Sequence, residues 1–514
     1  MYHPTDPTPA EIAALDPDPI DEDFEFIELK NVSTTDTINL NLVSFTNGID
    51  YTFDDSVDLG PGDYVVVYKN EAAFNARYPG FTGTKVGPYL GALDNGGEEI
   101  ELVDAIGQTI HEFEYKDGWY DITDGEGFSL TIRDSENPDP SSWSQKNSWC
   151  ASTYRDGSPG EADNGLLPDH AVVINEALAH SDAEVYDWIE LYNDTDQDIN
   201  IGGWYLSDND ADDPNLKKYQ IADGAVIYSH SYLVFTENEH FNNPGGDPGC
   251  LIPFALSEDG EEICISSAVG GELTGFRKVE DFGPSAADVA FGRYYNSGTD
   301  NYNFVAMDHN TKGYANADPK VWDVVINEIM YNPISLPGDT YDDEEYEYIE
   351  LYNRTGATVD LQEWDPVEME YVPWRFTRGI HYSFPPGASI PANGYIVVVK
   401  NKAAFSERYP TVPAGKIFGP FEEDMNLKNS GEKLDLSIPG DLVDTERMYI
   451  RIDRVDYSDG GHGENFPGGV DPWPSEPDGG NGDGSSLSRK VAGDYGNDVA
   501  NWQAAIASPA AANP

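Results

Sequence analysis

The stretch that decides the fold occurs three times in this chain of 514 residues. It reads Phe26-Ile27-Glu28-Leu29-Lys30-Asn31, then Trp188-Ile189-Glu190-Leu191-Tyr192-Asn193, then Tyr348-Ile349-Glu350-Leu351-Tyr352-Asn353. Apolar and polar residues alternate in each copy, as they do in a β-strand with one buried face. The copies lie roughly 160 residues apart, which is the length of a whole domain rather than of a solenoid repeat. The sequence therefore predicts three related β-domains in tandem.

Further matches between the copies place the domain boundaries. Residues 64–79 and 395–410 correspond without a gap, and each contains a predicted helix with a capping Asn at its start and a Pro at its end. The second copy lacks this helix. The predicted domains are residues 1–165, 166–319 and 320–514, joined by short linkers that favour a semi-rigid arrangement. The third is longer because residues 437–480, rich in Gly, Pro and Asp, are predicted to form a loop.

The first domain differs from the others at its start. The second and third begin with an apolar strand, residues 172–176 and 324–328, and the third continues into Met330-Tyr331-Asn332-Pro333. The numbered chain begins Met1-Tyr2-His3-Pro4, so Met1 aligns with Met330 and the opening strand is missing. Two explanations stay open: the chain is cut from a longer protein, or another molecule supplies the strand to an open sheet edge.

The composition limits the classes of partner. Asp and Glu number 94 against 29 Lys and Arg, which gives a net charge of -65. Such a surface repels nucleic-acid phosphates, so we expect no nucleic-acid partner. The same charge suits either cation binding or a high-salt environment. No apolar run approaches the roughly 18 residues of a membrane span, and the 50 Gly and 35 Pro are typical of turn-rich β-structure.

A wider pattern resembles a known family. The third copy carries it at 326–333, 348–353, Trp364, 394–398, Leu487, Trp502 and Ser508-Pro509, and the second at 174–176, 188–193 and 202–206. This pattern resembles the lamin tail domain, although Ala510 stands where that family has Gly. The resemblance implies an all-β fold of three immunoglobulin-like sandwiches without shared catalytic residues. Tandem copies with long acidic loops are similar to those of secreted bacterial proteins, which implies an extracellular or cell-surface location.

One acidic run has the composition of a metal site. Asp208-Asn209-Asp210-Ala211-Asp212-Asp213 places carboxylates at alternating positions, as at the start of a calcium loop. The sixth position is Asp213 rather than Gly and the twelfth is Tyr219 rather than Glu, so this is no EF-hand. The candidate Ca²⁺ ligands are Asp208, Asp210, Asp212 and Asp213. The alternative is a solvated acidic turn.

Other recurring polar residues favour structural roles. We expect the Glu of each copy, at positions 28, 190 and 350, to face solvent or bond to a neighbouring turn. Asn31, Asn193 and Asn353 each precede a Ser or Thr by two residues, which favours a strand-ending turn over glycosylation. Cys250 and Cys264 are a candidate disulfide pair, and Cys264 lies on the polar side of its predicted strand, which favours an exposed or oxidised sulfur.

Enzyme motifs are missing from the sequence: it contains no Gly-x-Ser-x-Gly, His-Glu-x-x-His, Gly-Lys-Ser/Thr phosphate loop or Gly-x-Gly-x-x-Gly. Trp119-Tyr120, Tyr294-Tyr295 and Trp473 suit either sugar stacking or packing between domains. We expect a non-catalytic extracellular structural or adhesive segment that self-associates through the open edge of the first domain. The alternative is a calcium-assisted, polysaccharide-binding appendage of a larger secreted enzyme.

Overall fold

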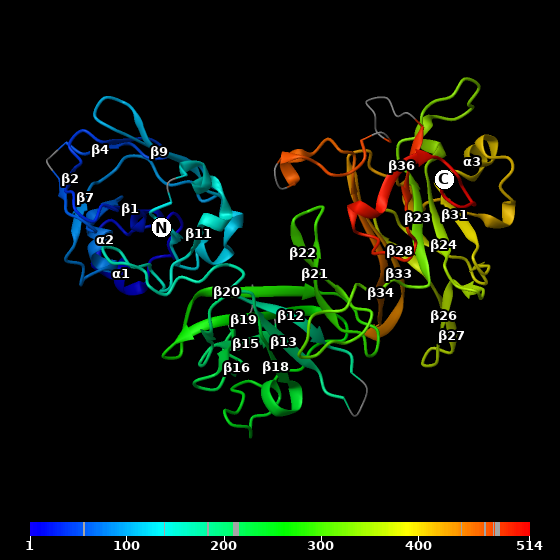
Figure 1. The fold of residues 1–514 in the computed structure, drawn as a ribbon, viewed down its shortest axis with the longest axis horizontal. Helices are drawn as coiled ribbons and strands as arrows, with labels where there is room; N and C mark the ends of the chain where they lie inside the picture. Colours follow the sequence, from blue (N-terminus) through cyan, green and yellow to red (C-terminus); the bar gives the residue numbers. More distant parts are fainter. Residues whose placement is uncertain are drawn as a thin grey trace.

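The repeated stretch forms a strand in each repeat of the computed structural model: β1 (Phe26–Lys30), β13 (Trp188–Asn193) and β24 (Tyr348–Asn353). The structure describes residues 1–514 except 55–56, 138, 182–184, 209–214, 444, 467–468, 476 and 478–483. Every described strand pairs only with strands of its own repeat. The chain forms three lobes, blue to cyan, green, and yellow-green to red (Figure 1). The predicted all-β, immunoglobulin-like fold is confirmed.

The third repeat shows the complete sandwich. One sheet has the order β32-β31-β24-β23-β35-β36, and the facing sheet has the order β29-β28-β33-β34. Ile326, Ile349 and Val398 of the first sheet pack against Leu434 and Val455 of the second. The remaining bounds are β23 (Val324–Met330), β28 (Arg375–Arg378), β29 (Tyr382–Ser383), β31 (Tyr395–Val399), β32 (Ile417–Phe418), β33 (Gly431–Val443), β34 (Glu446–Ser458), β35 (Ser485–Arg489) and β36 (Trp502–Ile506).

The second repeat has the same two layers. Its sheets have the orders β18-β13-β12-β21-β22 and β16-β15-β19-β20. Their strands are β12 (Val172–Leu178), β15 (Tyr205–Asp208), β16 (Tyr219–Gln220), β18 (Tyr232–Thr236), β19 (Glu261–Val269), β20 (Glu272–Phe282), β21 (Phe291–Asn296) and β22 (Asn301–Ala306). A π-helix, Glu237–Phe241, stands where the other repeats have an α-helix.

In the first repeat, one sheet is divided into two parts. The four-stranded sheet β4-β3-β8-β9 is whole, but the facing layer consists of β1-β6-β7 and a separate β10-β11 pair. These strands are β3 (Ser44–Asn47), β4 (Tyr51–Thr52), β6 (Tyr64–Tyr68), β7 (Thr84–Val86), β8 (Glu99–Val103), β9 (Thr109–Glu114), β10 (Leu130–Ile132) and β11 (Trp149–Ala151).

Short elements complete the repeats. The predicted helices are α2 (Glu71–Arg77) and α3 (Lys402–Arg408), capped by the Asn70 and Asn401 side chains as expected, and α1 (Pro9–Ala14) precedes them. Two-stranded pairs are β2 (Ile38–Asn39) with β5 (Asp58–Leu59), β14 (Ile199–Asn200) with β17 (Val226–Ile227), β25 (Val359–Asp360) with β30 (Ser389–Ile390), and β26 (Gln362–Asp365) with β27 (Glu370–Pro373). Among the described residues, no helix is long and apolar enough to cross a membrane.

Three expectations about these segments are wrong. The loop predicted over 437–480 is instead a long β33–β34 hairpin up to Ser458, because the two strands pair along their length and irregularities in register accommodate Pro439 and Gly440. Cys264 is fully buried in β19, where its sulfur lies 3.4 Å from the hydroxyl of the equally buried Ser266. Cys150, Cys250 and Cys264 are all thiols, so the candidate disulfide pair is not formed.

The strand-ending Asn has the expected structural role. In the third repeat, Asn353 is fully buried, donates to the carbonyls of Ala357 and Ile390 at 2.8 and 2.9 Å, and accepts from Thr355 N at 2.8 Å. Asn31 and Asn193 make matching contacts. The turn interpretation is confirmed, and these amides are too buried to carry a glycan in the folded chain.

Candidate functional site

In the second and third repeats, the larger sheet has a central strand that the first repeat lacks among its described residues. In the third repeat, β23 lies between β24 and β35, with Met330 opposite Tyr348 and Ile329 opposite Leu487. In the second repeat, β12 lies in the same way between β13 and β21. The matching neighbours in the first repeat, β1 and β10, have no strand between them in the part of the chain that the structure describes.

The chain enters the first repeat where the missing strand would end. Met1 N donates to Phe26 O, the position that matches Met330 beside Tyr348. Residues 27–30 of β1 are therefore paired on one side only, with β6. We call the gap between residues 27–30 and β10 the open slot.

The open slot leaves apolar side chains partly exposed. Ile349 and Leu351 of β24 are 0% exposed, as are the matching residues of β13, whereas Ile27 and Leu29 of β1 are only half-buried. On the other side of the slot, Leu130 is half-buried, whereas the matching Leu487 is 0% exposed. Among the described residues, β1 and β10 therefore have fewer strand partners and less core burial than their counterparts in the other repeats.

A buried polar network fixes the central strand of the complete repeats. In the third repeat, the Glu350 carboxylate accepts from Asn327 Nδ2 at 2.8 Å and from Ala510 N at 2.5 Å. Burial, followed by the nearby Glu328, raises the pKa of Glu350 to about 9. Glu350 thus bonds to a turn, as expected, but the alternative that it faces solvent is wrong.

Glu328 of β23 is held from the opposite side. It accepts from Ser508 N at 2.9 Å and from the Ser486 hydroxyl, and burial raises its pKa. Asn513 Nδ2 then donates to the Asn327 carbonyl at 3.0 Å. The Asn-Glu pair of the central strand is therefore bound by donors from the end of the same repeat. We call this set of contacts the Asn-Glu cradle.

The second repeat has the same cradle. Its acceptors are again a Glu on the central strand, Glu176, and a Glu on the neighbouring strand, Glu190, whose pKa burial raises to about 7. The donors are Asn175 and Gly313 to Glu190, Thr311 to Glu176, and Asn316 to the Asn175 carbonyl. Because N–H and O–H donors surround these carboxylates, their role in both repeats is to hold a strand.

The first repeat retains part of this cradle. Glu28 accepts from Gly160 N at 2.9 and 3.2 Å, as Glu350 accepts from Ala510 N. Burial raises the pKa of Glu28 to about 7. Ser129, directly before Leu130, matches Ser486, and Ser158, two residues before Gly160, matches Ser508. The residues that would carry the missing Asn and Glu belong to the absent strand.

The structure places only the first of the predicted calcium ligands. Asp208 ends β15 and forms an ion pair with Lys218, which is itself buried. Its charge is therefore already balanced within the repeat. Asp210, Asp212 and Asp213 lie outside the described residues, so the loop as a whole stays a prediction.

A second polar cluster joins the second and third repeats. The ligand atoms of His180, Glu258 and Asp441 all lie within 4.8 Å of one another, and Asp441 comes from the β33–β34 hairpin. His180 Nε2 lies 3.4 Å from Glu258, and Nδ1 lies 3.0 Å from the Ser285 carbonyl. Sequence patterns could not have indicated this cluster, because its members come from different repeats. His180 and Glu258 belong to the second repeat, and Asp441 is the member that the third repeat contributes.

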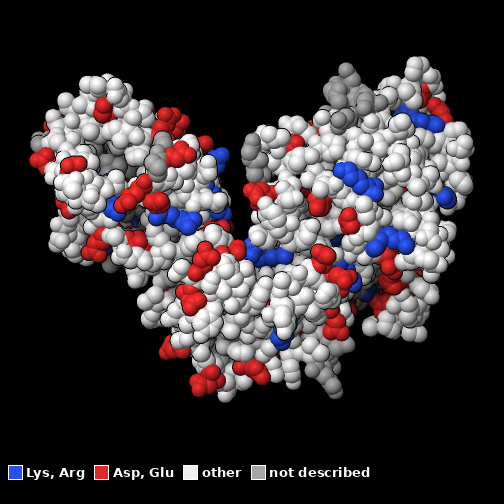
Figure 2. Space-filling model, in the orientation of Figure 1, with Lys and Arg blue, Asp and Glu red and all other residues white. Residues whose placement is uncertain are grey.

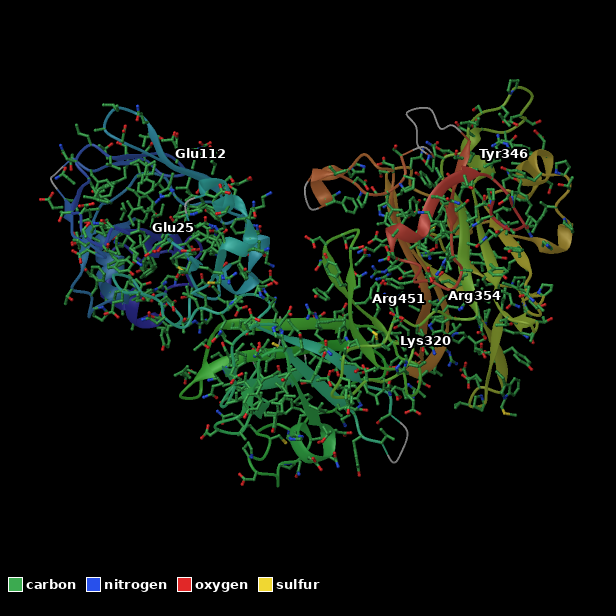
Figure 3. All side chains as sticks on the ribbon, in the orientation of Figure 1. Glu25, Glu112, Lys320, Tyr346, Arg354 and Arg451 are labelled. Carbon is green, nitrogen blue, oxygen red and sulfur yellow. The ribbon has the colours of Figure 1, made fainter. Side chains whose placement is uncertain are left out.

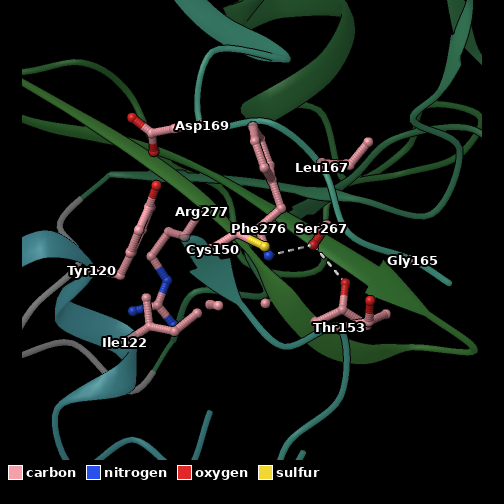
Figure 4. A pocket seen from close by; sticks show the side chains of 13 residues that line it. Tyr120, Ile122, Cys150, Thr153, Gly165, Leu167, Asp169, Ser267, Phe276 and Arg277 are labelled. Carbon is pink, nitrogen blue, oxygen red and sulfur yellow. Dashed lines mark hydrogen bonds between the residues drawn. The ribbon is translucent and has the colours of Figure 1, made fainter. Parts of the chain in front are cut away.

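A small cavity lies between the first and second repeats. It measures about 40 Å³ and holds at most a few waters. Figure 4 shows side chains of both repeats around it, among them Tyr120 and Cys150 of the first repeat and Phe276 and Arg277 of β20. Burial raises the pKa of the Cys150 thiol to about 12, so this sulfur is no nucleophile. The cavity is a packing feature of the junction.

Most of the aromatics named for sugar stacking or packing are packed, but Tyr295 is 46% exposed. Trp473 is 5% exposed and lies in the core of the third repeat, and the Tyr294 ring meets Tyr495 of the third repeat edge to face. Tyr120 O–H donates to Trp149 O at 3.0 Å. For Trp473, Tyr294 and Tyr120 the structure supports packing, and sugar stacking at Tyr295 stays a prediction.

Comparison with protein families gives one result for the whole chain. The family model described as Lamin Tail Domain matches residues 4–117, 168–278 and 318–449. Comparison with curated proteins and with solved structures found no match. The matched segments follow the three repeats and begin after residues 1–3, 167 and 317. This family is immunoglobulin-like and non-catalytic, in agreement with the two-layer sheets described above. The chain therefore belongs to the lamin tail domain family.

Proposed function

We propose that residues 1–514 form a non-catalytic, extracellular structural or adhesive segment. The observation that carries this proposal is that specific contacts fix both junctions between successive repeats. A chain of β-sandwiches held in one arrangement serves as a spacer or scaffold, because its length and the spacing of its surfaces are constant. The resemblance to secreted tandem modules and the strongly acidic surface, visible on all three lobes in Figure 2, support an extracellular location.

The first junction combines ion pairs with a backbone contact. Arg277 of β20 donates through both terminal nitrogens to Glu126 of the first repeat at 3.0 and 3.1 Å. Lys278 Nζ lies 2.5 Å from Asp169 in the linker. Gly275 N donates to Thr153 O at 2.9 Å, and a Cβ at this glycine would overlap the carbonyl of Ser152. Only glycine permits this approach of the two backbones.

The second junction is fixed at the linker and beyond it. Arg354 donates to the linker carbonyls of Val321 and Trp322 at 2.8 and 2.9 Å. Asn296 Nδ2 donates to Asn497 O at 2.9 Å, which connects β21 to the end of the third repeat. Figure 3 labels Lys320, Arg354 and Arg451 where these two lobes meet. The Arg354 side chain therefore holds the end of this linker, and the contact between Asn296 and Asn497 holds the two repeats together beyond it.

Small-angle X-ray scattering of a glycine variant tests the fixed arrangement. Gly275→Ala should open the first junction and raise the radius of gyration, while far-UV circular dichroism stays unchanged. The control is Gly283→Ala at the end of β20, since a Cβ there meets nothing within 4 Å. A Gly275→Ala chain whose scattering curve matches that of the unmodified chain would show that this junction does not fix the arrangement.

A specific observation favours the alternative of a polysaccharide-binding appendage assisted by calcium. Trp364 and Tyr371 lie opposite each other on the β26–β27 hairpin, 48% and 59% exposed, with ring centroids 5.1 Å apart. Exposed aromatic pairs of this kind suit sugar faces. Retention on insoluble polysaccharide that Trp364→Ala abolishes, and that chelation of Ca²⁺ weakens, would favour this function over the structural one.

A further inference from the structure

We propose that His180, Glu258 and Asp441 bind a Zn²⁺ ion that joins the second repeat to the third. The protein ligands would be His180 Nε2 and one carboxylate oxygen from each acidic residue, and these atoms lie within 4.8 Å of one another. Water would fill the remaining position. This inference goes beyond the proposed function, because the site would bind the ion whether or not the segment is structural.

The His180 ring is held with one nitrogen turned toward the carboxylates. Its Nδ1 lies 3.0 Å from the Ser285 carbonyl, which can only accept a hydrogen bond, so Nδ1 carries the hydrogen. In the neutral ring, Nε2 therefore presents its lone pair, and Glu258 Oε2 lies 3.4 Å from it. Two electron-rich atoms face each other stably only with a cation between them. A backbone carbonyl on the second nitrogen is also the usual support of a histidine that binds a metal.

The distance between these two atoms favours a metal ion over a proton. Charge-assisted N–H···O bonds place their heavy atoms about 2.7 to 2.9 Å apart. A separation of 3.4 Å is therefore long for a protonated His180 that bonds directly to Glu258. Ligand atoms about 2.0 to 2.1 Å from a tetrahedral Zn²⁺ lie about 3.3 to 3.4 Å from one another. The two atoms are thus spaced as two ligands of one ion.

One buried residue fixes both ligands of the second repeat. Ser285 is 2% exposed, and its N–H and its hydroxyl both donate to the Glu258 carbonyl, at 2.9 and 3.2 Å. Its own carbonyl is the acceptor for the His180 ring. The Asp288 N–H donates to the His180 carbonyl at 2.8 Å, which holds the backbone of the histidine as well. The pair is therefore in place before an ion binds, as a preorganised site requires.

The third repeat contributes its ligand from an irregular part of the β33–β34 hairpin. The register of pairing shifts between Pro439 and Leu442, so Asp441 lies in a bulge. Arg447, opposite Leu442, donates to Glu368 at 3.1 Å, so another carboxylate already balances its charge. Asp441 is exposed, and rotation of its side chain would bring its oxygen to the ion. Figure 1 shows this hairpin running down to the lobe of the second repeat.

The ligand set selects among divalent cations. Ca²⁺ and Mg²⁺ take oxygen ligands, whereas one imidazole nitrogen with two carboxylates suits Zn²⁺. The cation would also offset the repulsion between Glu258 and Asp441, which the fold brings together in a chain of net charge -65. Such an ion would hold the second junction by coordinate bonds, in addition to the hydrogen bonds of Arg354 and Asn296.

Calorimetric titration of the whole, chelator-treated chain with ZnCl₂ tests the site. Excess MgCl₂ is present throughout, because Mg²⁺ occupies exposed carboxylates but does not displace a metal from an imidazole. We expect one Zn²⁺ per chain. His180→Ala and the exposed Asp441→Asn should each weaken binding at least about tenfold. The matched control is His309→Ala, which should leave binding unchanged. Its Nδ1 also lies 3.4 Å from a carboxylate, that of Asp308, but no third ligand joins them among the described residues.

Hydrogen exchange shows whether the ion joins the two repeats. Zn²⁺ should slow exchange at residues 257–259 and 440–443 together, and should leave the β8–β9 hairpin of the first repeat unchanged. The proposal is overturned if Zn²⁺ fails to bind in excess MgCl₂, if Asp441→Asn binds it as tightly as the unmodified chain, or if only residues 257–259 are protected. The scattering test of Gly275→Ala concerns the first junction and is done without metal, so the two proposals fail separately.

Discussion

The buried carboxyl group of Glu28 makes the stability of the first repeat depend on pH. Burial raises its pKa to about 7 from the ordinary 4.5. Between these two values the folded chain binds a proton that the unfolded chain has lost, so the free energy of unfolding falls as the pH rises from about 4.5 to 7. The loss from this group alone is at most about 3 kcal/mol, at about 1.4 kcal/mol for each pKa unit.

Glu28→Gln should flatten this dependence, because the amide oxygen still accepts from Gly160 N but no longer titrates. The melting temperature of the first repeat should then fall less between pH 5 and pH 8 in scanning calorimetry than it does in the unmodified chain, and Glu25, whose pKa burial also raises to about 7, accounts for the fall that remains. The control is Glu161→Gln, an exposed position three residues from Ser158, which should retain the slope of the unmodified chain. An unchanged slope in Glu28→Gln would mean that other groups carry the pH dependence.

Among the elements, the helices α2 and α3 each begin at an Asn whose side chain caps the first turn. In α3, the Asn401 side chain accepts from Ala403 N and Ala404 N at 2.8 and 3.2 Å, and Phe405 is fully buried against the sheet. Asn401→Ala should destabilise the third repeat by about 1 kcal/mol in urea unfolding, the usual contribution of a side-chain cap. Ser406→Ala, at an exposed position of the same helix, should change the stability by less than about 0.5 kcal/mol. Equal effects of the two variants would argue against the cap.

These helices and the paired strands were predictable because their signals are local. A capping Asn, an Ala-Ala-Phe segment and a following Pro lie within one turn or two of each other. The β33–β34 hairpin was not predictable from its density of Gly, Pro and Asp, since what overrides that composition is pairing between residues such as Leu434 and Val455. Likewise, alternation in β13 and β24 suggested one buried face, whereas the turns that bind Glu190 and Glu350 bury the other as well.

The sequence predicted the strand arrangement around Glu28 but not the contacts of its carboxyl group. Comparison of repeats in the sequence indicated the missing strand, because Met1 aligns with Met330. It could not indicate the cradle, in which Glu28 bonds to Gly160, a residue 132 positions away. Distant donors of this kind have no pattern of their own, and only the fold brings them together. The same limit applies to His180 and Asp441, which belong to different repeats.

For the whole molecule, the large negative net charge affects stability through repulsion that is spread over many carboxylates. The chain carries -65 charges, yet the described basic side chains pair closely with carboxylates at the junctions, as Arg277 does with Glu126. The remaining carboxylates repel one another across the surface shown in Figure 2. Added salt shortens the screening length from about 30 Å at about 0.01 M to about 3 Å at about 1 M. The repulsion weakens accordingly, while the partly buried junction pairs are screened much less.

The melting temperature should therefore rise by several degrees as sodium chloride increases over this range, measured by scanning calorimetry at pH 8. Magnesium and calcium chloride at equal ionic strength should give the same rise, because screening does not distinguish the two ions. A larger rise with Ca²⁺ would instead indicate specific Ca²⁺ sites in the acidic loops. The Asp residues from Asp208 to Asp213 would then be the first to replace by Asn. A melting temperature that stays constant or falls with salt would show that repulsion among the carboxylates does not limit the stability of this chain.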